Sequence, residues 1–232
     1  MFDYFIANFS WQSIAWLPIG MVLLTCPLAV RRYRRLSPGL RYLALLVCFD
    51  ALMEITCSVF FNILQSSNLF LFPLITVGEL LLLALAYRQV LQSATFNRVV
   101  PWVLGLFGAY AVFETILELH TIRYAVSLGI ISDLALIGLA GLYFRKLLNE
   151  LQVERLQADP FFWVSVALIG HSLGDLLITL STNYLAAHYS LQLQRFLILG
   201  VRNIFNFLLY ASYFLALAMR PLPAKSLSVQ PG

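Results

Sequence analysis

The stretch LVCFDALMEITCSVFFN (46–62) decides the fold class, because it carries acidic side chains within an apolar run of membrane-spanning length. Polar residues recur every four positions in it, as they do in LIGHSLGDLLITLSTN (168–183). Residues four apart lie on one face of a helix. Each stretch therefore predicts a membrane helix with one polar row. The two rows are Asp50, Glu54, Ser58 and Asn62, and His171, Asp175, Thr179 and Asn183.

The composition is that of a polytopic membrane protein. Of the 232 residues, 61% are hydrophobic and 11% are charged, whereas about a quarter are charged in a soluble domain. Apolar runs of about 20 residues predict an all-α fold of seven transmembrane helices forming a single domain at 1–220. A Pro- and Ser-containing tail at 221–232 is expected to be disordered. The predicted spans are 12–30, 40–64, 69–90, 99–118, 122–144, 160–184 and 194–219.

The basic residues predict the orientation, because Lys and Arg are retained on the cytoplasmic side during insertion. We expect a multi-pass protein of the inner (cytoplasmic) membrane, with the N-terminus outside and the C-terminus inside. The net charge of +4 then reflects topology, and no nucleic-acid partner is predicted. Twelve basic residues share the inner side: Arg31, Arg32, Arg34, Arg35, Arg41, Arg88, Arg98, Arg145, Lys146, Arg155, Arg220 and Lys225.

The spacing of polar residues also predicts an internal repeat. Glu79 and Tyr87 follow the first row, and Arg202 and Tyr210 follow the second. The members of each pair are eight positions apart. The first three spans would then match the last three in a parallel 3+1+3 repeat, with the fourth as connector. Coincidence among Leu-rich helices is the alternative. Repeats of this kind place sites between their halves near mid-membrane.

This architecture resembles that of microbial rhodopsins and of the fused small sugar transporters. A retinal protein needs a Schiff-base lysine in its last helix. The two lysines of this chain, Lys146 and Lys225, are both predicted to be cytoplasmic. Retinal is therefore excluded, and no cofactor is predicted. A shared architecture does not imply a shared function.

Three stretches carry a closer resemblance: LFLFPLITVGELLLLALAYRQVL (69–91), FFWVSVALIGHSLGDLLITLSTNYL (161–185) and FLILGVRNIFNFLLYASYFLALAM (196–219). Together they resemble an uncharacterised family of small seven-helix membrane proteins of Bacteroidota-type bacteria, often encoded beside sensor histidine kinases. Glu79 in the third span and the Phe162-Trp163 opening of the sixth match its pattern. The resemblance implies a signalling context, with a sensor kinase or another membrane protein as partner besides the lipid bilayer.

The candidate ligand-binding residues are the ionisable and amide side chains within the spans. Arg202 stays protonated, and its guanidinium is expected to pair with Glu79 or Asp175, either as a static staple between helices or at a ligand site. Asn203 and Asn206 extend the polar patch. Acids outnumber bases, so not all can be ionised. The set is Asp50, Glu54, Glu79, His171, Asp175, Arg202, Asn203 and Asn206.

Several kinds of chemistry remain open for this set. His171 and Asp175, one turn apart, suit a proton relay or simple packing. A single histidine supplies too few of the His and Cys ligands that zinc sites use, so no metal site is assigned. No catalytic residue is assigned either. We expect a membrane sensor or accessory signalling component whose polar cavity binds protons or a small ligand. A transporter of protons or a small polar solute is the alternative, and an intramembrane enzyme acting on a lipid or isoprenoid is the second.

Overall fold

The computed structural model describes residues 11–65, 68–118, 126–150, 156–188 and 196–219. This part of the chain is helical and contains no strand. The predicted tail at 221–232 lies outside the described residues. The α-helices are α2 (Trp11–Arg32), α3 (Pro38–Asn62), α4 (Phe72–Leu91), α5 (Ala94–Glu118), α6 (Val126–Glu150), α7 (Pro160–His188) and α9 (Arg202–Ala218), and the π-helix η4 (Phe196–Val201) leads directly into α9.

Five of these helices are long and apolar enough to cross a membrane. The polytopic membrane class predicted from composition is therefore supported. The first and last predicted spans also fall on helices, namely α2 and the consecutive η4 and α9. The five candidate spans are Pro38–Phe60, Phe72–Leu91, Ala94–Ile116, Val126–Asn149 and Pro160–Ser181.

The connection between α4 and α5 is shorter than the sequence predicts. Only Gln92 and Ser93 separate the two helices, whereas the predicted fourth span begins at residue 99. Gln92 has a φ of 49°, the left-handed conformation that commonly ends a helix. Arg88 Nε donates to Asn97 Oδ1 across this turn at 3.1 Å. The result is a tight α4–α5 hairpin.

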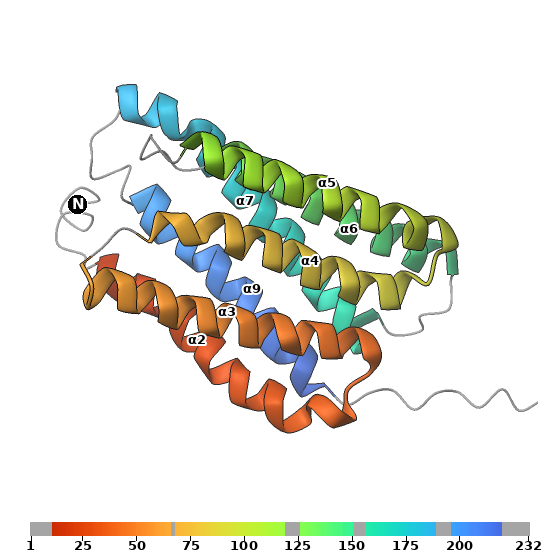
Figure 1. The fold of residues 1–232 in the computed structure, drawn as a ribbon. Coiled ribbons are helices and arrows are strands. Elements are labelled where there is room, and N and C mark those ends of the chain that lie inside the picture. The colour runs from red at the N-terminus through yellow and green to blue at the C-terminus, as the bar shows by residue number, and fades with distance from the viewer. Residues whose placement is uncertain (1–10, 66–67, 119–125, 151–155, 189–195, 220–232) are drawn as a thin grey trace, which may run out of the picture.

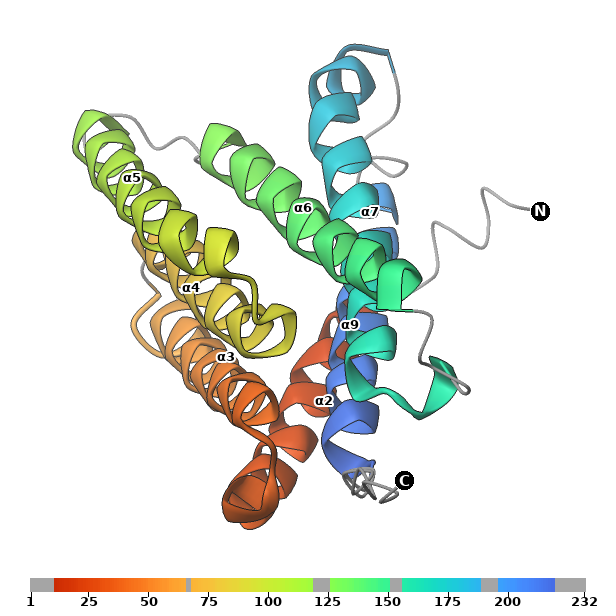
Figure 2. The ribbon, with the colours of Figure 1, turned by 90° about the vertical axis from the view of Figure 1, so that its right-hand side faces the viewer.

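Six helices form a closed ring, and α5 lies outside it. The neighbouring pairs are α2 with α3, α3 with α4, α4 with α6, α6 with α7, α7 with α9, and α9 with α2. Helix α5 packs mainly on α4, and Figures 1 and 2 show it at the edge of the bundle. Side chains that point into the ring can therefore meet from all six helices.

The surface of the bundle is apolar and several ionisable groups are inside. Trp102 and Leu106 on α5 are 80% and 75% exposed, and Leu177 on α7 is 67% exposed. Asp50 and Asp133, by contrast, are 3% and 6% exposed. This inverted pattern suits hydrocarbon as solvent, where charged groups turn inward to find polar partners.

Contacts between helix ends place many basic residues at one end of the bundle. Lys146 Nζ, near the end of α6, donates to the Val90 carbonyl of α4 at 2.7 Å. Arg32 Nη1, at the end of α2, donates to the Leu217 carbonyl of α9 at 2.5 Å. Arg41, in the first turn of α3, donates through Nε to the Leu36 carbonyl at 3.0 Å. We refer to this as the basic end.

Candidate functional site

The two polar rows lie on α3 and α7, on opposite sides of the ring. Asp50 and Glu54 occupy successive turns of α3, and Asp50 is the more deeply buried of the two. His171 and Asp175 occupy successive turns of α7. The side chains of Asn62 and Asn183 are not among those that the structure describes, so each row is followed over three of its four positions.

Arg202 and Asp175 form a two-pronged ion pair between α9 and α7. Arg202 Nη2 donates to Asp175 Oδ2 at 2.6 Å, and Arg202 Nε contacts Asp175 Oδ1. Such fork-to-carboxylate geometry fixes orientation as well as charge. The predicted pairing of Arg202 with a carboxylate is confirmed. The side chains are 28% and 12% exposed, so the pair is only partly enclosed.

The remaining acids gather around this pair. Glu79 on α4 lies within electrostatic range of Glu54, Asp133 and Asp175, and Asp50 interacts with Glu54 and Glu79. We call these five acids the carboxylate cluster. Four helices contribute to it, α3, α4, α6 and α7, and α9 supplies the arginine. The ring thus joins acids that are as far apart in the chain as Asp50 and Asp175.

Positive charge is scarce beside the carboxylate cluster. Among the described side chains, His171 and Arg202 are the basic groups whose interactions with it are resolved. Asp50 Oδ1 and His171 Nδ1 are buried and have no hydrogen-bond partner within the described part of the chain. Buried polar atoms are normally satisfied. These two atoms therefore mark positions suited to a proton, a water molecule or a polar atom of a ligand.

Four further residues join the site that are not among the predicted ligand-binding residues. Asp133 on α6 interacts with Asp175 and Arg202, and the fully buried Ser172 lies beside it. Tyr210 and Tyr213 on α9 interact with Asp50 and Glu79. The signal for the tyrosines was present in the spacing, because Asn206, Tyr210 and Tyr213 follow one another at steps of four and three on one helix face.

The two predicted asparagines lie at the beginning of α9. Asn203 and Asn206 are half-buried and follow the ion-paired Arg202 within about one turn. The π-helical turn of η4 ends at Val201, immediately before Arg202. Such turns are frequent at functional sites.

Glu114 belongs to a different contact. It is 7% exposed on α5 and accepts a hydrogen bond from Ser127 Oγ of α6, away from the carboxylate cluster.

Within the described residues, no group of three or more His, Cys, Asp and Glu side chains is arranged to hold a metal ion. The excess of acids over bases in the ring suits proton binding and recognition of a cationic ligand.

Comparison with protein-family models, with characterised proteins and with solved structures finds no significant match.

Proposed function

We propose that this chain is a membrane sensor or accessory signalling component whose carboxylate cluster binds protons or a small cationic ligand. One observation carries the proposal. Five carboxyl groups meet inside the ring, where Arg202 and His171 are the resolved positive partners. Several like charges close together at low dielectric cannot all be ionised. The cluster must hold protons or a cation, and its occupancy must change with their concentration.

The position of the cluster offers a way to report that occupancy. Its acids belong to α3, α4, α6 and α7, and the Arg202–Asp175 pair ties α7 to α9. A bound cation would compete with Arg202 for carboxylate oxygens and change how these helices pack. Coupling then requires that the cation bind two arrangements of the bundle with different affinity. A sensor kinase or another membrane protein, the partner that the resemblance implies, would respond to this change in helix packing.

The proposal includes seven spans, with the N-terminus outside and the basic end in the cytoplasm of a bacterial cell. Five helices already meet the requirements for crossing, and α2 and η4–α9 complete the ring with them. Gathering of Arg32, Arg41 and Lys146 at one end agrees with retention of basic residues on the inner side.

Infrared difference spectroscopy between about pH 5 and pH 8 tests proton binding. We expect a carboxyl band that changes with pH and is lost or shifted in Asp50→Asn. Glu114→Gln is the matched control, because Glu114 is a buried acid outside the cluster. The band should persist in that variant. If no carboxyl titrates in this range and Asp50→Asn matches the parent in stability, the cluster is structural and the proposal fails.

A transporter is the second candidate, and the pairing of helices favours it. Exchanging α2 with α6, α3 with α7, and α4 with α9 turns each contact of the ring into another contact of the ring. This is the relation expected of the proposed parallel 3+1+3 repeat, in which α5 connects the halves. Proteoliposomes containing a pH-sensitive dye separate the candidates. Proton flux that Asp50→Asn abolishes would favour a transporter, whereas binding without flux would favour a sensor.

A further inference from the structure

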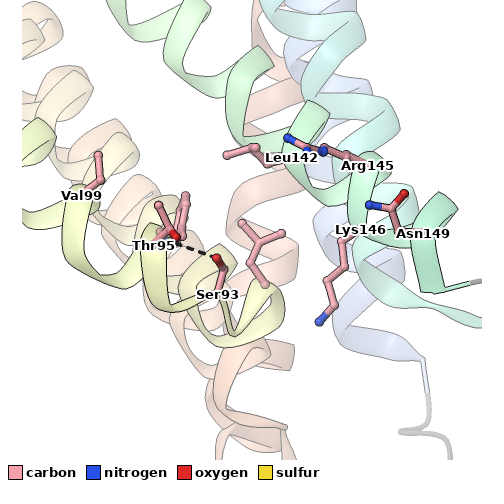
Figure 3. Close-up of a pocket in the computed structure, with 9 residues that line it drawn as sticks. Ser93, Thr95, Val99, Leu142, Arg145, Lys146 and Asn149 are labelled. Atoms are coloured by element: carbon pink, nitrogen blue, oxygen red, sulfur yellow. Dashed lines mark hydrogen bonds between the residues drawn. The ribbon is translucent and has the colours of Figure 1, made fainter.

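A pocket outside the carboxylate cluster lies at the basic end, between the beginning of α5 and the last turns of α6 (Figure 3). Its volume is about 640 Å³. Ser93 and Thr95 line it from the α5 side, and Arg145, Lys146 and Asn149 line it from α6. None of the described residues that line it is acidic. The polar part of the pocket is therefore suited to an anion.

The polar part of the pocket combines basic side chains with the beginning of a helix, and both favour a phosphate. Lys146 is fixed by its hydrogen bond to the Val90 carbonyl. The neighbouring Arg145 is exposed, so its side chain is accessible to a ligand. Helix α5 starts at Ala94, beside the pocket, and the first N–H groups of a helix favour anions. Two cationic side chains of α6 and the beginning of α5 thus line the same pocket.

An apolar path leads away from the polar part. Val99 and Leu142 line the pocket on α5 and α6. On α5 the same face continues one and two turns further with the exposed Trp102 and Leu106. On α6 it continues with Gly138, where a Cβ would meet no heavy atom within 4 Å. The two helices therefore leave an open apolar path beside the anion pocket.

The pocket also lies at the depth of lipid head groups. The candidate spans Ala94–Ile116 and Val126–Asn149 both have one end there. Basic pockets between membrane helices on the cytoplasmic side bind anionic head groups. A free phosphate would use the polar part alone, whereas a phospholipid also uses the apolar path.

We propose that this pocket binds one anionic phospholipid of the inner leaflet, with its phosphate near Arg145 and Lys146 and an acyl chain along the path past Gly138. This goes beyond the proposed function, because it involves a different ligand and no member of the carboxylate cluster. The lipid would fill the space between α5 and α6, which contact one another much less than their neighbours in the ring do.

Native mass spectrometry of the purified full chain, titrated with phosphatidylglycerol or phosphatidylcholine, tests the proposal. We expect selective retention of phosphatidylglycerol, weakened about tenfold in Arg145→Gln. Arg98→Gln removes an equal charge from an exposed position of α5 that does not line the pocket, and it should weaken binding less than about twofold. Gly138→Leu should weaken lipid binding without any change of charge, because its side chain occupies the apolar path.

Three outcomes would overturn the lipid site. Equal losses in Arg145→Gln and Arg98→Gln would mean diffuse attraction to the basic end. Equal retention of phosphatidylcholine would remove the requirement for an anion. Displacement of the lipid by millimolar inorganic phosphate, with Gly138→Leu unaffected, would make this a site for a soluble anion. Thermal unfolding of each variant without lipid confirms that it folds.

Discussion

At the scale of single residues, the bidentate contact of Arg202 with Asp175 determines how much negative charge the ring must hold. One guanidinium cancels one carboxylate, and Asp50, Glu54, Glu79 and Asp133 remain beside it. Acids this close together in low dielectric cannot all be ionised, and this is the basis of the proposed sensitivity to cations and to pH. A purely structural staple would need only the pair itself.

Arg202→Gln tests the contribution of the pair to stability. We expect a loss of about 2–3 kcal/mol, less than the loss for a fully buried pair because Arg202 is partly exposed. Adding Asp175→Asn should restore part of that loss, since the unpaired carboxylate is removed. Equilibrium unfolding in mixed detergent micelles measures both variants.

Arg88→Gln provides the control for this measurement. Arg88 is exposed and donates to Asn97, so its loss should cost less than about 1 kcal/mol. Equal losses in Arg202→Gln and Arg88→Gln would show that the Arg202–Asp175 pair adds little to the bundle.

The sequence predicted which acids lie inside the bundle better than it predicted how they pair. Residues at four-residue spacing within apolar runs must turn inward, which identified Asp50, Glu54 and Asp175. Spacing within one helix says nothing of which helices become neighbours. The choice of Asp175 for Arg202 therefore came from the α7–α9 contact, and the approach of Asp133 came from the position of α6 in the ring.

At the scale of elements, two glycines set how closely neighbouring helices approach. A Cβ at Gly78 of α4 would collide with the ring of Phe49 from α3. A Cβ at Gly174 of α7 would lie 2.6 Å from the ring of Phe205 on α9. Small residues allow this close approach in membrane bundles. Each glycine directly precedes an acid of the carboxylate cluster, Gly78 before Glu79 and Gly174 before Asp175. These close contacts therefore also position the cluster.

Gly174→Ala should destabilise the bundle by about 1–3 kcal/mol, because the Phe205 ring must move away from α7. Gly170→Ala is the matched control, one turn earlier on α7, where a Cβ would meet no heavy atom within 4 Å. It should be neutral or slightly stabilising, since alanine favours helix more than glycine does. Thermal unfolding in one detergent compares the two variants, and Phe205→Leu should rescue Gly174→Ala. Equal stability of the two alanine variants would contradict the steric argument.

The π-helical turn is an element that the sequence could not predict. Phe196–Val201 reads as an apolar helical run that continues into α9. A π-helical turn forms when packing against other helices favours it, and no residue pattern within this stretch marks its position. The α4–α5 turn illustrates the same limit, because hydropathy places the ends of spans but does not show where helices begin outside them.

At the scale of the whole molecule, hydropathy predicts the all-helical membrane class but not which helices are neighbours. Composition alone required long apolar helices with their charges turned inward. It could not reveal that α5 stays outside while six helices close around the acids. Closure brings four acid-bearing helices and α9 to one polar centre. In the proposed function, a change at that centre would act directly on each helix of the ring except α2.

The topology of the molecule is tested by cysteine labelling on either side of α4. With Cys26, Cys48 and Cys57 replaced by alanine, a single cysteine is introduced at Ser67 or at Ser93, which flank the span Phe72–Leu91. If the basic end faces the cytoplasm, an impermeant maleimide should label Ser67→Cys in intact spheroplasts and Ser93→Cys only after permeabilisation. The opposite result would place the basic end outside and remove the inner-leaflet lipid from the pocket beside Arg145. Labelling of both positions in intact spheroplasts would mean that α4 does not cross the membrane, and the seven-span arrangement would then be wrong.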